Sequence, residues 1–278
     1  EPAKTATTGA FLRVVGEEDI ISMTLTKGSS FDRAYFKFRD GALLGLDSYD
    51  APKLVNDNFD FSSRFANTSQ LAINAVNDLP CGSELFLDLR FTKNSSGAFV
   101  INPEGSYNVA FEISGSEFDK YKISLIDQFT GTELVVTPGF KYDFGITSDP
   151  ASLVSDRLKL RFEGILPSLN LELVGADVVC GSKETTLVVK NTDKRFEYFL
   201  SNGGEVISTE KSGNDGDLSF AVPGSSLLPG SNQLNVGVKG VCGTEFLTSK
   251  WEVNRYQDAS ISVKEGDILV SNYTTGNQ

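Results

Sequence analysis

The chain has 278 residues, of which 40% are hydrophobic and 22% charged, the composition of one large or two medium globular domains and not of a wholly disordered chain. Its 25 Lys and Arg against 37 Asp and Glu give a net charge of −12, which argues against nucleic acid and anionic membrane surfaces as partners. The chain has no histidine, which excludes His-based catalytic triads and His-ligated zinc.

Apolar side chains alternate with polar ones along most of the chain, the pattern of half-buried β-strands. In chain order the predicted strands are Ile20–Thr26, Ala34–Phe38, Leu71–Val76, Leu85–Phe91, Val109–Ile113, Tyr121–Asp127, Leu158–Phe162, Thr186–Lys190, Phe196–Leu200, Leu218–Val222, Leu234–Val238 and Phe246–Val253. Gly- and Asn-rich turns such as Asn94–Gly97 and Asn202–Gly204 separate them. No segment carries a helical apolar stripe, and Ala51–Leu54 and Ser62–Ala66 are expected to form single helical turns at most. The fold class is therefore all-β.

Breaks in the strand pattern divide the chain into three parts. The segment Gly164–Pro167 separates two strand-rich regions, and a second break falls at Asn254–Asp258. We expect residues 1–166 to form a jelly-roll-like β-sandwich and residues 167–256 an immunoglobulin-like β-sandwich. Residues 257–278 hold two short strands around a Gly-Asp turn, too little chain to bury a core. We interpret this tail as the start of a truncated further repeat.

Several runs carry a family resemblance. They are Asp32–Ala42, Leu46–Leu54 and Leu71–Asn74; Ser106–Val109, Ile123–Thr132, Tyr142–Phe144 and Asp156–Phe162; and the tail Ile261–Gln278. These runs resemble those of modular surface proteins that Bacteroidota export through the type IX secretion system, which include large adhesins of gliding species. Two departures are Cys81 within Pro80–Gly82, where a Pro-Leu-Gly is more usual, and the lack of a sorting-signal domain in this chain.

The resemblance implies a function outside the cell. We expect a non-catalytic fragment of a secreted adhesin or its stalk at the cell surface, involved in adhesion or gliding motility and not inserted directly in the membrane. Its implied partners are the type IX translocon or outer-membrane anchoring proteins, and a surface polysaccharide or solid substrate. The alternative is a carbohydrate-binding module of a secreted polysaccharide-degrading enzyme.

Three cysteines are present. An exported protein favours disulfides, so we expect a bond between Cys180 and Cys242, which would close about 60 residues. The alternative is a pair of small buried thiols. Cys81 is then the odd cysteine, expected to be buried and unreactive.

Acidic residues crowd one stretch between predicted strands. Asp47, Asp50, Asp57 and Asp60 lie close to Asn56 and Asn58, and oxygen-rich loops of this kind bind calcium in sandwich lectins. The spacing does not fit an EF-hand loop. The alternative is a set of Asx turns in a solvated loop. Calcium is the one cofactor that the sequence suggests.

Aromatic side chains offer a second type of site. A sugar-stacking platform would draw on Trp251, Tyr49, Tyr121, Tyr198 and Tyr256, whereas the alternation of Trp251 with Val253 favours a core position for the tryptophan. Loops at the sandwich ends, such as Asn56–Thr68, are the expected place for binding. With 37 acidic residues, a pair of carboxylates carries no signal for a glycosidase, and we expect no enzyme.

Overall fold

The computed structural model describes residues 18–65, 69–257, 261–264 and 267–270. It is an all-β protein that divides into two compact units. The first unit comprises the described residues up to Leu79 together with Ser83–Asp119 and Ile123–Phe162. The second comprises Pro80–Gly82, Lys120–Lys122 and the described residues from Glu163 onward. The main division, after Phe162, falls just before the Gly164–Pro167 segment.

Strands β1 to β11 of the described chain join in one continuous sheet with the order β10-β7-β1-β2-β5-β4-β6-β11-β8-β9, and β3 adds to β5. Their bounds are β1 Ile20–Lys27, β2 Ser30–Phe38, β3 Ala51–Pro52, β4 Phe59–Arg64, β5 Leu71–Val76, β6 Ser83–Phe91, β7 Gly105–Ser114, β8 Tyr121–Asp127, β9 Thr132–Val135, β10 Phe140–Ile146 and β11 Leu158–Gly164. Two 3₁₀ turns, η1 (Glu117–Lys120) and η2 (Pro150–Leu153), interrupt the strand succession.

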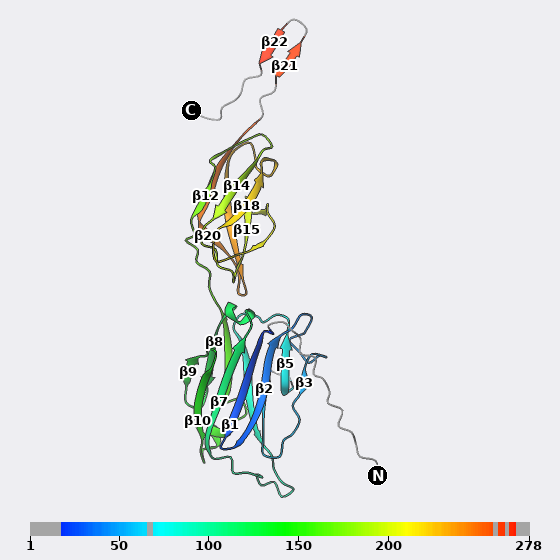
Figure 1. The fold of residues 1–278 in the computed structure, drawn as a ribbon, viewed down its shortest axis with the longest axis vertical. Helices are drawn as coiled ribbons and strands as arrows, with labels where there is room; N and C mark the ends of the chain where they lie inside the picture. Colours follow the sequence, from blue (N-terminus) through cyan, green and yellow to red (C-terminus); the bar gives the residue numbers. More distant parts are fainter. Residues whose placement is uncertain (1–17, 66–68, 258–260, 265–266, 271–278) are drawn as a thin grey trace, which may run out of the picture. The chain divides into compact units, whose positions relative to one another are not determined.

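The sheet folds over on itself to make a sandwich. Phe36 on β2 and Phe162 on β11 lie 5.3 Å apart between ring centroids, and Phe59 on β4 lies 6.4 Å from Tyr107 on β7. One layer is therefore β10-β7-β1-β2-β5, seen side by side in Figure 1, and the other is β4-β6-β11-β8-β9. Each large apolar side chain buried between the layers stabilises the fold by about 1.5–3 kcal/mol.

The alternation of apolar and polar side chains predicted most of these strands, because each of them buries one face. On β11, for example, Leu158, Leu160 and Phe162 are buried while Lys159 and Arg161 are partly exposed. Strand β4 was not predicted: Phe59–Ser63 are all buried, so polarity does not alternate along it. It lies where the sheet passes from one layer to the other, pairing with β6 and with β5. Ala51 and Pro52 form the short strand β3 and not the helical turn expected there.

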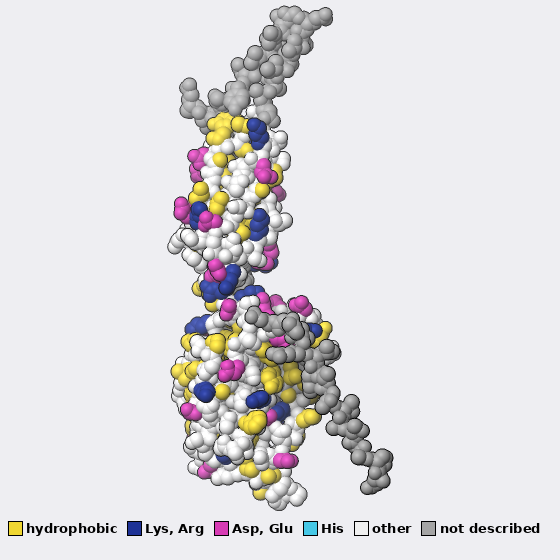
Figure 2. Space-filling model, viewed as in Figure 1, with side chains coloured by type: hydrophobic (Ala, Val, Ile, Leu, Met, Phe, Trp, Pro, Cys, Tyr) yellow, Lys and Arg dark blue, Asp and Glu magenta, His cyan; other side chains and the backbone are white. Residues whose placement is uncertain are grey.

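The outer face of the first layer is polar. Thr24 of β1, Arg33 and Lys37 of β2 and Glu112 of β7 alternate with buried neighbours. In the view of Figure 2, acidic, basic and apolar side chains are interspersed over this face of the unit. Mixed charge of this kind maintains solubility and does not mark a binding surface by itself.

The second unit is an immunoglobulin-like sandwich. One sheet has the order β12-β14-β18 and the other β13-β20-β19-β15-β16, with β17 added to β15. The bounds are β12 Leu173–Gly175, β13 Val178–Cys180, β14 Glu184–Val189, β15 Glu197–Asn202, β16 Glu205–Val206, β17 Lys211–Ser212, β18 Leu218–Pro223, β19 Gly230–Gly240 and β20 Gly243–Tyr256. A 3₁₀ turn, η3, spans Gly224–Ser226. Trp251 is buried in the core with Tyr198 and Leu234, which confirms its predicted core position.

The tail contributes an antiparallel hairpin. Strand β21 (Ile261–Lys264) pairs with β22 (Asp267–Val270) in a two-stranded sheet. Two strands were expected here, and the further repeat that they would begin stays a prediction.

The disulfide differs from the predicted one. Cys242 bonds to Cys81, with the two Cα atoms 5.0 Å apart, and Cys180 is free and exposed. Both bonded residues belong to the second unit. Cys180 pairs in register with Tyr256 at the end of β20, whereas Cys242 lies in the turn before β20 begins. That strand separates them by about 40 Å at its rise of about 3.3 Å per residue, far beyond disulfide reach. Cys81 is exposed and not buried.

Candidate functional site

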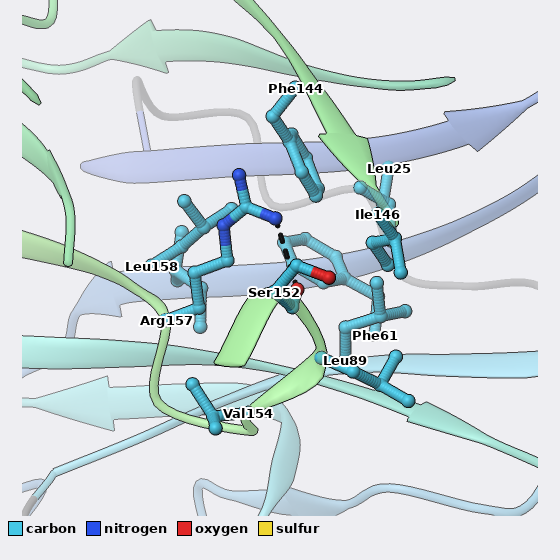
Figure 3. A pocket seen from close by; sticks show the side chains of 11 residues that line it. Leu25, Phe61, Leu89, Phe144, Ile146, Ser152, Val154, Arg157 and Leu158 are labelled. Atoms are coloured by element: carbon cyan, nitrogen blue, oxygen red, sulfur yellow. Dashed lines mark hydrogen bonds between the residues drawn. The ribbon is translucent and has the colours of Figure 1, made fainter. Parts of the chain in front are cut away.

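The first unit contains a small apolar cavity between its layers (Figure 3). It is lined by Leu25, Phe61, Phe144, Ser152, Arg157 and other residues, and its volume is about 10 Å³. A space of that size holds one water molecule at most. The cavity is therefore part of the core and offers no room for a ligand.

Arg157 is the polar centre beside this cavity. Its Nε and Nη2 donate to the two carboxylate oxygens of Asp127 at 2.9 and 2.8 Å, and its Nη1 donates to the carbonyls of Gly145 and Ser152. Figure 3 shows the bond to Ser152. The guanidinium carbon lies 4.9 Å from the ring centroids of both Phe129 and Phe144. Because each of these Arg157 N–H groups already bonds to the protein, we assign Arg157 a structural role.

Two further groups donate hydrogen bonds to the Asp127 carboxylate. Tyr142 donates its hydroxyl to Asp127 at 2.9 Å, and the backbone N–H of Phe129 donates to the same carboxylate at 3.0 Å. Burial raises the pKa of Asp127, but the bonds from Arg157, Tyr142 and Phe129 outweigh burial and hold that pKa below its usual value. These side chains lock β8, β10 and the start of β11 together.

The predicted calcium residues do not converge on one point. Asp47 accepts from the backbone N–H groups of Leu43 and Tyr49, at 2.6 and 2.7 Å. Asp50 accepts from the N–H groups of Asp47 and Ala75, both at 2.9 Å. These carboxylates are used as turn caps, the alternative that the sequence left open.

The other two acidic residues lie apart. Asp60 is buried within β4 and accepts from the N–H of Asn56 at 2.6 Å, whereas Asp57 is exposed before the strand. Across the described residues, no group of three or more Asp, Glu or Cys side chains could hold a metal ion. In the part of the chain that the structure describes, the four predicted calcium residues form no such group, and the carboxylates of Asp47, Asp50 and Asp60 accept bonds from backbone N–H groups instead.

One larger hollow opens on the first unit. It has a volume of about 270 Å³ and a mainly polar lining of Asp19, Phe38, Arg39, Asp40, Asn77 and Glu117. This volume is close to the lower end of the range for small-ligand pockets, about 300 Å³. Its side chains supply carboxylate, guanidinium and amide groups together with one aromatic ring, the types that hydrogen-bond to and stack on sugars. We define these six residues as the polar hollow.

Backbone contacts bring distant segments together at the hollow. The N–H of Phe38 donates to the carbonyl of Asp19 at 2.9 Å, and the N–H of Glu117 donates to the Asp19 carboxylate at 2.8 Å. On the other side, the N–H of Arg39 donates to Val76 at 2.8 Å and that of Gly41 to the Asn77 side chain at 3.1 Å. The ends of β2, β5 and β7 and the start of β1 thus fix the lining.

Tyr49 adds an exposed aromatic ring next to the hollow. The Arg39 guanidinium carbon lies 5.7 Å from its ring centroid, a cation–π contact. Tyr49 is 41% exposed, and its backbone N–H donates to the Asp47 carboxylate. Gly41, two residues after Arg39, has a φ of +79°, which turns the chain there. Tyr49 is therefore an oriented and accessible platform.

The same loop exposes aliphatic side chains. Leu43, Leu44, Leu46, Leu54 and Val55 are all exposed between β2 and β4. Asp47 and Asp50 hold the first part of this loop by the turn bonds given above, so exposure here accompanies an ordered backbone.

The other predicted platform residues lie elsewhere. Trp251, Tyr121 and Tyr198 are buried, and Tyr256 is half-buried at the end of β20. Of the predicted platform, only Tyr49 lies beside the hollow. The hollow itself was missed, because its residues come from four segments far apart in sequence and no local pattern joins them.

Comparison with known proteins gives little similarity. No family model and no curated protein sequence matches the chain. Solved structures that match include a polysaccharide lyase, at 10% identity and a TM-score of 0.24, over 86% of this chain and 39% of the lyase chain. Another is the SGBP-B protein of the Bacteroides ovatus mixed-linkage glucan utilization locus in complex with a mixed-linkage heptasaccharide. It matches at 10% identity and a TM-score of 0.23, over 89% of this chain and 66% of that chain.

Among the residues that the structure describes, no helix has the length and apolarity to cross a bilayer.

Proposed function

We propose that the first unit binds polysaccharide at the polar hollow and Tyr49, as a non-catalytic module of an exported surface protein. The observation that carries the proposal is the juxtaposition of a 270 Å³ hollow lined with hydrogen-bonding side chains and an exposed tyrosine ring held by Arg39. Sugars are recognised by this combination, because hydroxyl groups pair with polar side chains while ring C–H faces stack on aromatic rings. This favours the carbohydrate-binding alternative over a purely adhesive shaft.

The direct experiment is a polysaccharide microarray with the whole chain, followed by calorimetry on the ligands that bind. We expect Tyr49→Ala to weaken binding about tenfold, a loss of about 1.4 kcal/mol. Phe99→Ala is the matched control, since Phe99 has a similar exposure of 39% and lies in the loop between β6 and β7. Equal effects of the two substitutions, or no binding to any polysaccharide, would contradict the proposal.

The absence of catalysis is tested in the same samples. The bound polysaccharide is incubated with the protein, and new reducing ends and unsaturated products are measured over time. We expect neither. Chain cleavage that Asp40→Asn abolishes would instead assign the hollow to an enzyme.

The adhesin expectation and export through the type IX system stay predictions. Deletion of this chain from its parent protein, with surface attachment and secretion measured separately, tests both. Loss of attachment with normal secretion is the result expected of a binding module.

A further inference from the structure

Three carboxylates and one guanidinium define the charge of the polar hollow. Asp19, Asp40 and Glu117 face a space that Arg39 also lines. Asp40 and Arg39 are exposed, and Asp19 and Glu117 are half-buried. With the carboxylates ionised, the lining carries a local charge of −2, on a chain whose net charge is −12.

The hydrogen-bonding groups of the hollow, like its charge, favour ligands without negative groups. Ionised carboxylates are acceptors only, so a ligand that pairs with Asp19, Asp40 and Glu117 must supply donors. Sugar hydroxyl groups supply them, and charge-assisted bonds of this kind are among the stronger ones. A ligand carboxylate or sulfate supplies only acceptors and meets like charge in a hollow that is partly shielded from water.

Arg39, the one cation among the six described residues of the polar hollow, also contacts the Tyr49 ring. The Arg39 guanidinium lies against the Tyr49 ring, so it serves both the hollow and the platform. The Tyr49 ring and the hollow therefore adjoin through Arg39. That arrangement suits a chain of at least two sugars.

We infer that the site selects uncharged polysaccharides over acidic ones, with one sugar stacked on Tyr49 and another sugar of the same chain hydrogen-bonded to the carboxylates of the hollow. This inference rests on the proposed function. It adds the class of polysaccharide that binds, and it assigns the preference for uncharged chains to Asp19, Asp40 and Glu117.

The test compares ligands with the same backbone and different charge. Calorimetry measures binding of a neutral β-glucan and a neutral galactomannan to the whole chain, each before and after oxidation of its primary hydroxyls to carboxylates. At low ionic strength we expect oxidation to weaken binding at least about tenfold, and the difference to shrink in high salt as charges are screened.

Two variants test whether the charge of the hollow causes the preference for neutral ligands. Asp40→Asn removes a charge from the hollow, and Glu112→Gln removes one from the exposed outer face of β7. We expect only Asp40→Asn to reduce the difference in binding affinity between the neutral and the oxidised ligands. Equal effects would overturn the role of the hollow, because net charge alone would then explain the preference.

Other outcomes separate the two proposals. Oxidised ligands that bind as well as the neutral ones, with binding still dependent on Tyr49, would overturn the inference and leave the polysaccharide site standing. No binding to either form of either ligand would overturn both.

Discussion

The guanidinium of Arg157 and the carboxylate of Asp127 form a two-bond ion pair at 2.9 and 2.8 Å, with both side chains buried. The pair joins the end of β8 to the residue before β11, and Tyr142 extends it to β10. A buried pair of this type is costly to break, because removal of one partner leaves an uncompensated charge in the core.

Arg157→Met should therefore destabilise the first unit by about 3–5 kcal/mol. Scanning calorimetry of the whole chain measures the effect. Glu133→Gln is the control, because its pair with Arg161 is 3.5 Å long with side chains 45% and 32% exposed, and it should change stability by less than about 1 kcal/mol. A loss below about 1 kcal/mol for Arg157→Met would show that the pair does not hold the strands together.

Stability should also fall in acid. Burial raises the pKa of Asp127, but bonds from Arg157 and Tyr142 lower it further than burial raises it, and the net shift is downward. A carboxyl whose pKa is depressed on folding stabilises the protein above its unfolded pKa of about 3.9 and loses that contribution as pH falls through the folded pKa. Urea unfolding at pH 7, 5, 4 and 3 should show the loss below about pH 4.

Asp127→Asn tests the assignment. The variant should be less stable at pH 7 and should lose less stability between pH 4 and 3 than the unaltered protein, since the titrating group is gone. An unchanged acid dependence would assign the effect to other carboxylates.

Peptide mapping distinguishes the two cysteine pairings. A non-reduced tryptic digest should contain a peptide that joins Cys81 to Cys242, while Cys180 reacts with a maleimide in the native protein because it is free and exposed. Cys180→Ser should leave the thermal midpoint unchanged, whereas Cys81→Ser should lower it. A peptide that joins Cys180 to Cys242 would contradict the structure.

Asp50 is expected to act as a loop anchor and not as a calcium ligand. Asp50→Ala removes the acceptor for the N–H groups of Asp47 and Ala75, and each lost bond to a charged acceptor costs about 1.5–3 kcal/mol locally. Hydrogen exchange at Ala75 should accelerate in the variant. Calcium and EDTA should leave the melting temperature of the unaltered protein unchanged, and a calcium-dependent rise would restore the metal site.

Side-chain alternation was enough to place most strands. Ile21, Met23 and Leu25 are fully buried at every second position of β1, and such a pattern is local because neighbouring side chains of a strand point to opposite faces. It predicted the all-β class and the core position of Trp251. It failed for β4, where Asp60, Ser62 and Ser63 are buried together with Phe59 and Phe61.

Pairing across long sequence distances depended on the fold. Cys242 meets Cys81 across 161 positions, and the polar hollow draws Asp19, Asp40, Asn77 and Glu117 from four separate segments. Strand register and loop geometry decide which of these groups come into contact, and no single stretch of residues determines either of them. Composition could exclude histidine chemistry, but only the folded sheet brought Arg39 and Tyr49 to the edge of that hollow.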